Sequence, residues 1–283
     1  MPSTGTSLPV VHHLKLAKKA LLIMKLLVIN PNTSEDVSRL IHAEADRAAG
    51  VGTELIMRTA PFGVQYIETR VESLFAGNAV AQVIAEEHQG VDGVVVAAFG
   101  DPGMPGLKEF VDIPVVGITE AALYTAALQG SRFSIVAISH RITAWYRECV
   151  DRNGLASRLG SIRSLRDPVS SIGSVQEDFE AQLLQLAQQV VDEDSADVVI
   201  LAGAPLAGLA RKVGDQIPVP VVDGISAGVK QCELLVSLAG GIHQKGSFAH
   251  PPLKPNVGLS PEIAAILNSD NSERRTLSPR THS

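Results

Sequence analysis

Short apolar runs rich in branched side chains alternate with longer segments of helical periodicity along residues 25–238. Because consecutive parallel strands need a long connection, usually a helix, this alternation predicts an α/β fold built from βα units with parallel sheets. The runs are continuous rather than alternating with polar residues, which indicates strands buried on both faces. We expect strands at Leu26–Asn30, Glu54–Arg58, Gly93–Phe99, Pro114–Ile118, Phe133–Ile138, Val198–Ala202 and Pro220–Val222.

The helical segments are marked by apolar residues that recur three or four positions apart. One such face begins at Val37 and predicts a helix directly after the first strand. Another begins at Val175. Ser174 precedes it and Glu177 follows three residues later, a spacing that predicts a capping box at the start of this helix.

Composition narrows the class of protein. The chain has 283 residues, of which 45% are hydrophobic and only 4% aromatic, so we expect an aliphatic core. With 24 basic and 30 acidic residues the net charge is −6, which argues against a nucleic-acid partner because phosphate binding needs clustered cations. Cys149 and Cys232 lie far apart without neighbouring histidines, which predicts neither a disulfide nor a metal site. No apolar run approaches the ~20 residues of a membrane span, so we expect a cytoplasmic protein without a membrane partner.

The two ends of the chain differ from its central part. Residues 1–24 contain only a short apolar stretch and no small-residue cleavage site, unlike a secretory signal, and we interpret them as an N-terminal extension. Met24 is an alternative start of translation. Residues 239–283 are rich in Pro, Ser, His and Asn, and we expect a disordered tail with one short helix near Pro261–Leu267. The α/β body is therefore placed at residues 25–238.

A pattern of strand, glycine- and proline-bearing turn, helix and strand occurs twice, in Asp92–Ile118 and again in Asp197–Ile225. The two copies are similar in length, which predicts two pseudo-symmetric lobes, each with a parallel sheet. Ligands of such sheets bind beyond the carboxyl ends of the strands. We therefore expect the active site in the cleft between the lobes, with the two turns as its opposite walls.

The segment Asn30-Pro31-Asn32-Thr33-Ser34 ends the first predicted strand and begins the first predicted helix. Because free amides at a helix start attract negative charge, Asn30, Asn32 and Thr33 are candidates for binding a carboxylate or an imide oxygen. The alternative is ordinary capping by Thr33 or Ser34. Two asparagines before a cap exceed what capping requires, which favours a binding site.

Glycine-bearing turns follow the central strand of each predicted lobe. In the first turn, Gly100 lets the backbone approach a ligand closely, and Asp101 could act as a base or as a hydrogen-bond acceptor. The alternative is a tight turn in which Asp101 caps the next helix. The residues expected to contact substrate at these turns and at the end of the last strand are Ala98, Phe99, Gly100, Gly203, Ala204 and Asp223.

Two further acid–base candidates follow predicted strands. His140 comes after Phe133–Ile138, so it reaches the same sheet edge as the turns and could transfer protons, unless it is an ordinary surface histidine. Glu120 comes after Pro114–Ile118 and either lines the cleft or caps the next helix. Ser226 lies in a Gly-x-Ser-x-Gly pattern, but only the tail offers an acid and a histidine after it, which argues against a serine hydrolase.

Four parts of the chain carry a further signal when they are taken together: Val28–Thr33, Ala97–Gly103, Pro114–Ile118 with Glu120–Ala122, and Pro220–Gly224. This combination resembles the hydantoin and allantoin racemases of the aspartate/glutamate racemase superfamily. The resemblance covers most of the body. It implies two pseudo-symmetric α/β lobes, an active site between them that needs no cofactor, a small-molecule substrate and a homo-oligomer.

The chain departs from this family at two positions. The family's reaction moves a substrate α-proton between two cysteines, one from each lobe, because a thiol can serve as acid or base near neutral pH. Ala98 and Gly203 stand where the resemblance places those cysteines. Cys149 and Cys232 lie in helical segments and cannot be assumed to replace them. The small residues leave space at both positions for a larger substituent or a catalytic water.

Three hypotheses follow. A cofactor-independent racemase or isomerase would act on a small carboxylate or on a five-membered cyclic imide such as hydantoin or allantoin, with Asp101, Glu120 or His140 as base. A lyase, decarboxylase or ring hydrolase would use the same cleft without thiols, with the anion-binding turn stabilising an oxyanion or enolate. A non-catalytic accessory protein would keep the cleft only to bind its ligand. The resemblance favours the first.

Overall fold

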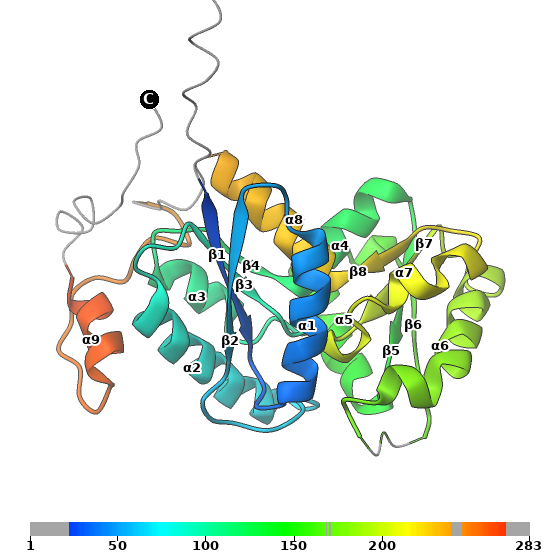
Figure 1. Cartoon of the computed structure of the whole chain (residues 1–283), viewed down its shortest axis with the longest axis horizontal. Coiled ribbons are helices and arrows are strands. Elements are labelled where there is room, and N and C mark those ends of the chain that lie inside the picture. The colour runs from blue at the N-terminus through cyan, green and yellow to red at the C-terminus, as the bar shows by residue number, and fades with distance from the viewer. Residues whose placement is uncertain (1–22, 168, 170, 239–244, 270–283) are drawn as a thin grey trace, which may run out of the picture.

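Two four-stranded parallel sheets stand side by side in the computed structural model (Figure 1), which describes residues 23–167, 169, 171–238 and 245–269. The strand order is β2-β1-β3-β4 in the first sheet and β6-β5-β7-β8 in the second. The orders are equivalent, which confirms the predicted α/β fold with two pseudo-symmetric lobes. The strands are β1 (Met24–Asn30), β2 (Thr53–Thr59), β3 (Gly93–Val96), β4 (Val115–Gly117), β5 (Phe133–Ala137), β6 (Leu159–Ser164), β7 (Val198–Ala202) and β8 (Val221–Asp223).

The strand predictions are confirmed in position but wrong in two details. The strand that begins at Gly93 ends at Val96 rather than at Phe99, and Ile118 begins a helix instead of ending a strand. In addition, β6 was not predicted. It is an edge strand whose residues are all half-buried. Only two of its side chains are aliphatic, so it lacks the apolar run that marks the buried strands.

Helices cover both faces of each sheet. The Ser34 hydroxyl caps α1 by accepting the Val37 N–H at 3.3 Å. At the start of α6, the Ser174 hydroxyl donates to the Asp178 carboxylate at 2.6 Å and makes no capping bond, so the predicted capping box with Glu177 is wrong. The helices are α1 (Glu35–Ala48), α2 (Arg70–Glu87), α3 (Met104–Phe110), α4 (Ile118–Gln129), α5 (Thr143–Arg152), α6 (Val175–Asp192), α7 (Leu209–Val213), α8 (Gly224–Ser237) and α9 (Pro261–Asn268).

Two helices cross between the lobes (Figure 1). Helix α4 follows β4 of the first sheet, yet it packs against β7 and β8 of the second. Helix α8 follows β8 of the second sheet and packs against β1, β3 and β4 of the first. The two helices also pack against each other. Each lobe therefore supplies a helix that covers the inner face of the other lobe's sheet.

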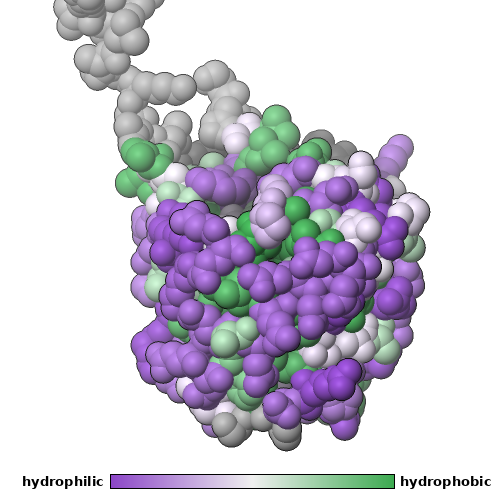
Figure 2. All heavy atoms as spheres, turned by 90° about the vertical axis from the view of Figure 1, so that its right-hand side faces the viewer, coloured by the Kyte–Doolittle hydropathy of each residue, from purple (hydrophilic) through white to green (hydrophobic). Residues whose placement is uncertain are grey.

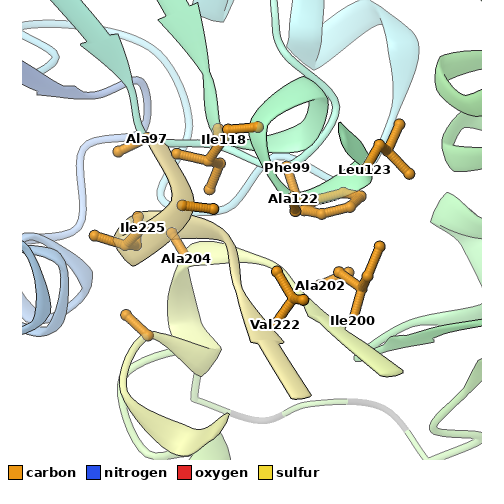
Figure 3. Packing of buried hydrophobic residues seen from close by; sticks show 14 of the residues in the cluster. Ala97, Phe99, Ile118, Ala122, Leu123, Ile200, Ala202, Ala204, Val222 and Ile225 are labelled. Carbon is orange, nitrogen blue, oxygen red and sulfur yellow. The ribbon is translucent and has the colours of Figure 1, made fainter. Parts of the chain in front are cut away.

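The largest apolar cluster lies between the two sheets and contains side chains of both lobes (Figure 3). Leu26 of β1, Ile118 of α4 and Ile200 of β7 all belong to it. Neighbouring residues of the same strands, such as Leu27 and Val199, belong instead to separate clusters on the outer faces. Successive residues of one strand thus enter different cores, which explains the continuous apolar runs in the sequence.

A buried carboxylate joins the lobes where α1 meets α8. The Glu44 side chain of α1 is only 2% exposed and accepts hydrogen bonds from Arg47 and from the Ser226 hydroxyl of α8. Arg211 of α7 lies 3.5 Å from its other oxygen. Burial opposes ionisation, but these hydrogen bonds and charges together hold the pKa of Glu44 below its usual value. Ser226 therefore has a structural partner, in agreement with the argument against a serine hydrolase.

The helix predicted in the C-terminal region is confirmed as α9, which packs against α2 on the outer side of the first lobe (Figure 1). Ile266 of α9 is buried in the outer apolar cluster of that lobe. The predicted disorder of the rest of the tail stays a prediction. Residues 239–244 and 270–283 lie outside the described residues, as do residues 1–22 of the predicted extension.

The outer face of the second lobe, where α6 lies, is mostly hydrophilic (Figure 2). Helix α6 is amphipathic: Leu183 and Ala187 are buried, whereas Gln182 and Gln185 are exposed. None of the helices that the structure describes is long and apolar enough to span a membrane.

Replacing Glu44 by Gln keeps the shape of the side chain and removes its charge from beside two arginines. Because Arg47 and Arg211 are about half exposed and water screens the charge left behind, we expect Glu44→Gln to lower the free energy of unfolding by about 2 kcal/mol, through the weakened hydrogen bonds of the buried side chain. Glu148→Gln is the matched control, since Glu148 also joins the lobes, through Arg70, but is 57% exposed; its loss should stay below about 1 kcal/mol. Urea unfolding measures the loss of unfolding free energy in both variants, and equal losses would contradict a special role for the buried carboxylate.

Candidate active site

A cleft of about 740 Å³ opens between the lobes beyond the carboxyl ends of the strands, but the two glycine turns predicted as its walls are not among its lining residues. Thr33 and Tyr66 line it from the loops that follow β1 and β2 in the first lobe. His140 and Arg166 line it from the loops that follow β5 and β6 in the second lobe. These strands occupy equivalent places in the two sheets, so the cleft follows the pseudo-symmetry of the chain.

The asparagine turn after β1 uses most of its polar groups internally. Asn30 is fully buried, and its amide nitrogen donates to Asn32 Oδ1 at 3.0 Å and to Ser38 Oγ at 2.9 Å. Asn32 Oδ1 also accepts the Ser34 N–H at 2.9 Å. No acceptor among the described residues takes the Asn32 Nδ2 group, but Asn32 is buried, and it is Thr33 that lines the cleft. Asn30 therefore holds the turn, and Thr33 is the predicted binding residue of this turn that reaches the cleft.

The first glycine turn places the Asp101 carboxylate at the N-terminus of α4. Asp101 has a left-handed backbone conformation (φ 48°) and accepts the Thr119 and Glu120 N–H groups, each at 2.9 Å. Gly117 permits this approach, because a side chain there would meet the Asp101 carboxylate at 2.3 Å. Burial, and after it the Glu120 charge, raise the pKa of Asp101 to about 7 against the effect of the two N–H donors. These contacts support the capping alternative for Asp101.

Glu120 is engaged at the same helix start. Its carboxylate accepts the Gly117 N–H at 3.2 Å and lies 2.7 Å from the ammonium group of Lys108 in α3. This arrangement also supports capping rather than proton transfer. The predicted contact residues 98–100 are buried and do not line the cleft, and Phe99 packs against the ring of Tyr146 with 4.7 Å between centroids.

The corresponding turn of the second lobe contains Gly203 and Ala204. Gly203 has a φ of 118°, a backbone conformation that residues other than glycine rarely adopt. Gln176 of α6 fixes the turn by donating to the Pro205 and Ala207 carbonyl oxygens, each at 2.9 Å. Ala204 is buried, and neither it nor Gly203 lines the cleft.

Asp223 at the end of β8 repeats the arrangement of Asp101 in the second lobe. Its carboxylate accepts the Ile225 and Ser226 N–H groups at 2.8 and 3.0 Å, and the Gly208 N–H at 2.7 Å. Burial raises the pKa of Asp223, and the three N–H donors oppose this effect. The start of each crossing helix is thus capped by a carboxylate, from the turn after β3 for α4 and from the end of β8 for α8, which leaves Asp223 committed to structure.

Of the predicted acid–base residues, His140 is the one that lines the cleft. It is exposed and begins a short 3₁₀ segment, His140–Ile142, after β5. Its neighbours fix this segment across the cleft: the Ser139 hydroxyl donates to Glu68 of the first lobe, and Arg141 Nε lies 3.6 Å from the other Glu68 oxygen. The structure therefore brings His140 and Thr33 to the same cleft and leaves Asp101, Glu120 and Asp223 outside its lining.

Neither cysteine lies in the cleft. Cys149 of α5 is buried with its Sγ 3.6 Å from the Gly100 carbonyl oxygen, and burial raises its pKa to about 11. Cys232 of α8 is buried 3.7 Å from the Val94 carbonyl oxygen, and burial raises its pKa as well. Both side chains therefore stay protonated near neutral pH, which makes them poor bases.

Sequence reasoning missed the loops after β2 and β6. The first carries Tyr66 and Glu68, and the second carries Arg166; all three line the cleft. Tyr66 and Glu68 could have been identified by their position after a predicted strand, because every loop that follows a parallel strand reaches the same edge of the sheet. The loop after β6 could not be found in this way, since β6 itself was not predicted.

A second groove adjoins the cleft at His140 and Arg166 and runs along α6 past Gln182 and Gln189. It has a similar volume, about 740 Å³, but it belongs to the second lobe alone. Within the described ranges, no group of three or more His, Cys, Asp or Glu side chains is placed to hold a metal ion.

Comparisons with known proteins agree with this architecture. A hydantoin racemase of Pseudomonas sp. (strain NS671) is 33% identical over 244 residues, covering 83% of this chain and 95% of that protein. A hydantoin racemase of Paenarthrobacter aurescens is 33% identical over 236 residues, covering 82% and 99%. Allantoin racemase from Klebsiella pneumoniae has a TM-score of 0.81 at 32% identity, over 85% of this chain and 98% of that one. Residues 26–232 match the family described as Asp/Glu/hydantoin racemase, and the chain belongs to this family.

Proposed function

We propose that this protein is a racemase-type enzyme that inverts the stereocentre of a small five-membered cyclic imide of the hydantoin or allantoin type. The observation that carries the proposal is the cleft that both lobes build in equivalent ways, in a chain 33% identical to hydantoin racemases over almost their full length. Its volume of about 740 Å³ lies within the range of small-molecule sites.

Polar groups from both lobes suit a ligand with carbonyl oxygens. On the first lobe the Thr33 hydroxyl lines the cleft, and the amide nitrogen of its neighbour Asn32, which donates to no described acceptor, lies buried directly behind it. Arg141 and Arg166 add positive charge on the second lobe, whereas carboxylates also line the cleft, which favours a neutral imide over a carboxylate ligand. These carboxylates belong to Glu35, Asp36, Glu68 and Asp167. Donors on opposite walls would hold a planar ring between the lobes and expose both of its faces to the protein.

Proton transfer needs a group other than the family's thiols, because Ala98 and Gly203 carry no acid or base. We assign this role to His140, since an imidazole can accept and return a proton near neutral pH. His140 would take the proton from the ring carbon next to a carbonyl, leaving a planar enolate. Return of a proton from the imidazolium or from water, to either face, gives the two enantiomers. Asp101 and Glu120 support the neighbouring turn as caps.

We further propose that the enzyme works without a cofactor, in the cytoplasm and as a homo-oligomer. The reaction above moves only protons, so the residues of the cleft suffice for it. Val71, Leu74 and Phe75 form one exposed apolar face of α2, which supports contact with a second copy. Free cysteines at positions 149 and 232 are consistent with a reducing compartment.

Proton exchange in D2O tests the function and the base together. We expect the wild-type protein to remove the ring-carbon proton signal of allantoin or a 5-substituted hydantoin faster than buffer alone. His140→Gln should slow this exchange by about 10²–10⁴-fold, the usual contribution of a general base. His42→Gln is the matched control, because His42 is exposed on α1, pairs with Asp46 and does not line the cleft.

The outcomes separate the hypotheses. Undiminished exchange in His140→Gln would contradict the assigned base while leaving the reaction in place. New product signals without exchange would contradict the racemase and favour a lyase or ring hydrolase in the same cleft. Complete silence across the substrates would contradict the proposed reaction.

Asn32→Asp tests the donor on the first lobe. The new carboxylate can still accept from Asn30 and Ser34, so the turn should persist. It replaces the free amide nitrogen by a negative oxygen, which repels carbonyl and carboxylate groups of a ligand. We expect KM to rise at least about tenfold, since a lost hydrogen bond weakens binding by about 1.5 kcal/mol. Steady-state racemisation rates followed by polarimetry check this, and an unchanged KM would remove Asn32 from the binding site.

A further inference from the structure

The Tyr66 hydroxyl is exceptional among the polar groups of this protein. Of all buried side-chain nitrogen and oxygen atoms in the described residues, it is the one without a hydrogen-bond partner. Such a group is costly because it has left water without gaining an acceptor. Tyr66 is one of the residues that line the cleft between the lobes, with its hydroxyl oxygen buried just beneath that surface. An acceptor supplied by a ligand in the cleft would remove this cost.

The chain around Tyr66 is held on both sides. Before it, the Val64 carbonyl accepts the Thr33 N–H at 3.0 Å, which ties the loop to the asparagine turn. After it, Ile67 is buried and Glu68 accepts the Ser139 hydroxyl of the second lobe. The hydroxyl therefore lacks a partner because of where a well-anchored loop places it, and not because the loop is loose.

The ring itself reaches from the first lobe to the second. Tyr66 packs against the outer apolar cluster of the second lobe, which contains Ile138 and Leu165. Burial, and after it the phenol of Tyr66, raise the pKa of Tyr146, whose ring packs at a tilt of 55° against Phe99 of the first glycine turn. Tyr66 thus joins the cleft lining to the apolar core of the second lobe.

The hydroxyl is a donor at any physiological pH. Burial, followed by the charges of Glu68 and Glu72, raises the pKa of Tyr66 above its usual value. It therefore keeps its proton and cannot act as the base. A fixed donor in a water-poor site interacts strongly with an oxygen that becomes negative, because no solvent has to reorganise.

We propose that Tyr66 donates a hydrogen bond to the ring carbonyl oxygen that becomes the enolate oxygen when the neighbouring proton is removed. The inference rests on the proposed function and gives the enzyme, besides its base, a hydrogen-bond donor to the oxygen that becomes negative. The C–H electron pair moves into the ring as the proton leaves, and negative charge collects on the carbonyl oxygen beside the hydroxyl. Tyr66 keeps its own proton throughout and stabilises the enolate until a proton returns to carbon.

Tyr66→Phe isolates the hydroxyl, because the ring that packs against the second lobe remains. Loss of a donor to a developing oxyanion lowers kcat by about 10²-fold, and KM should change much less. The thermal unfolding midpoint of the free protein should stay the same or rise, since an unpartnered buried group is removed. Tyr124→Phe is the matched control: its hydroxyl donates to the Asn153 carbonyl at 3.3 Å on an exposed surface. It should leave exchange unchanged.

Exchange of the allantoin or hydantoin ring proton in D2O and thermal unfolding are measured on all three full-length proteins. Wild-type rates in Tyr66→Phe would overturn this inference alone, and so would a clear fall of its unfolding midpoint, which would reveal a structural partner for the hydroxyl. A wild-type protein without exchange overturns the proposed function and this inference with it. Slow exchange at an unchanged or higher midpoint supports the inference.

Discussion

The exchange of α4 and α8 between the lobes is the constraint on which the rest of the structure depends. Each helix starts at the last strand of one sheet and buries its apolar face on the other sheet, so the inner core contains residues of both lobes. Because neither half can complete this core alone, the lobes are held at a set separation. The cleft between their loops exists because the cores below it are shared.

The crossing helices also decide what the acidic residues do. Each helix start leaves N–H groups without partners, and Asp101 and Asp223 fill this need at α4 and α8. Acids at strand ends, which resemble catalytic groups in a sequence, are therefore absorbed by the architecture. The cleft is lined instead by the loops after β1, β2, β5 and β6, which carry His140 and Tyr66, and the proposed chemistry rests on these loops.

The sequence predicts the fold correctly where a local pattern of residues determines the local structure. Buried strands such as β7 are continuous aliphatic runs, and the repeated strand–turn–helix unit reveals two lobes. Prediction fails where the outcome depends on distant contacts. For Glu120 the sequence leaves open whether it lines the cleft or caps the helix, and its ion pair with Lys108 of α3, together with the local cap at Gly117, decides for the cap. Tyr66 is notable because its buried hydroxyl has no hydrogen-bond partner among the described residues, and no local sequence pattern could predict this.

Hydrogen–deuterium exchange with allantoin tests the central claim that the ligand binds between the lobes. A ligand shared by both walls should slow amide exchange in residues 31–38 and 64–70 of the first lobe and in residues 138–142 of the second, all at once. Slowing confined to the second groove along α6, or to one lobe, would contradict a site built by both. Such a result would place the ligand, and the reaction, elsewhere on the molecule.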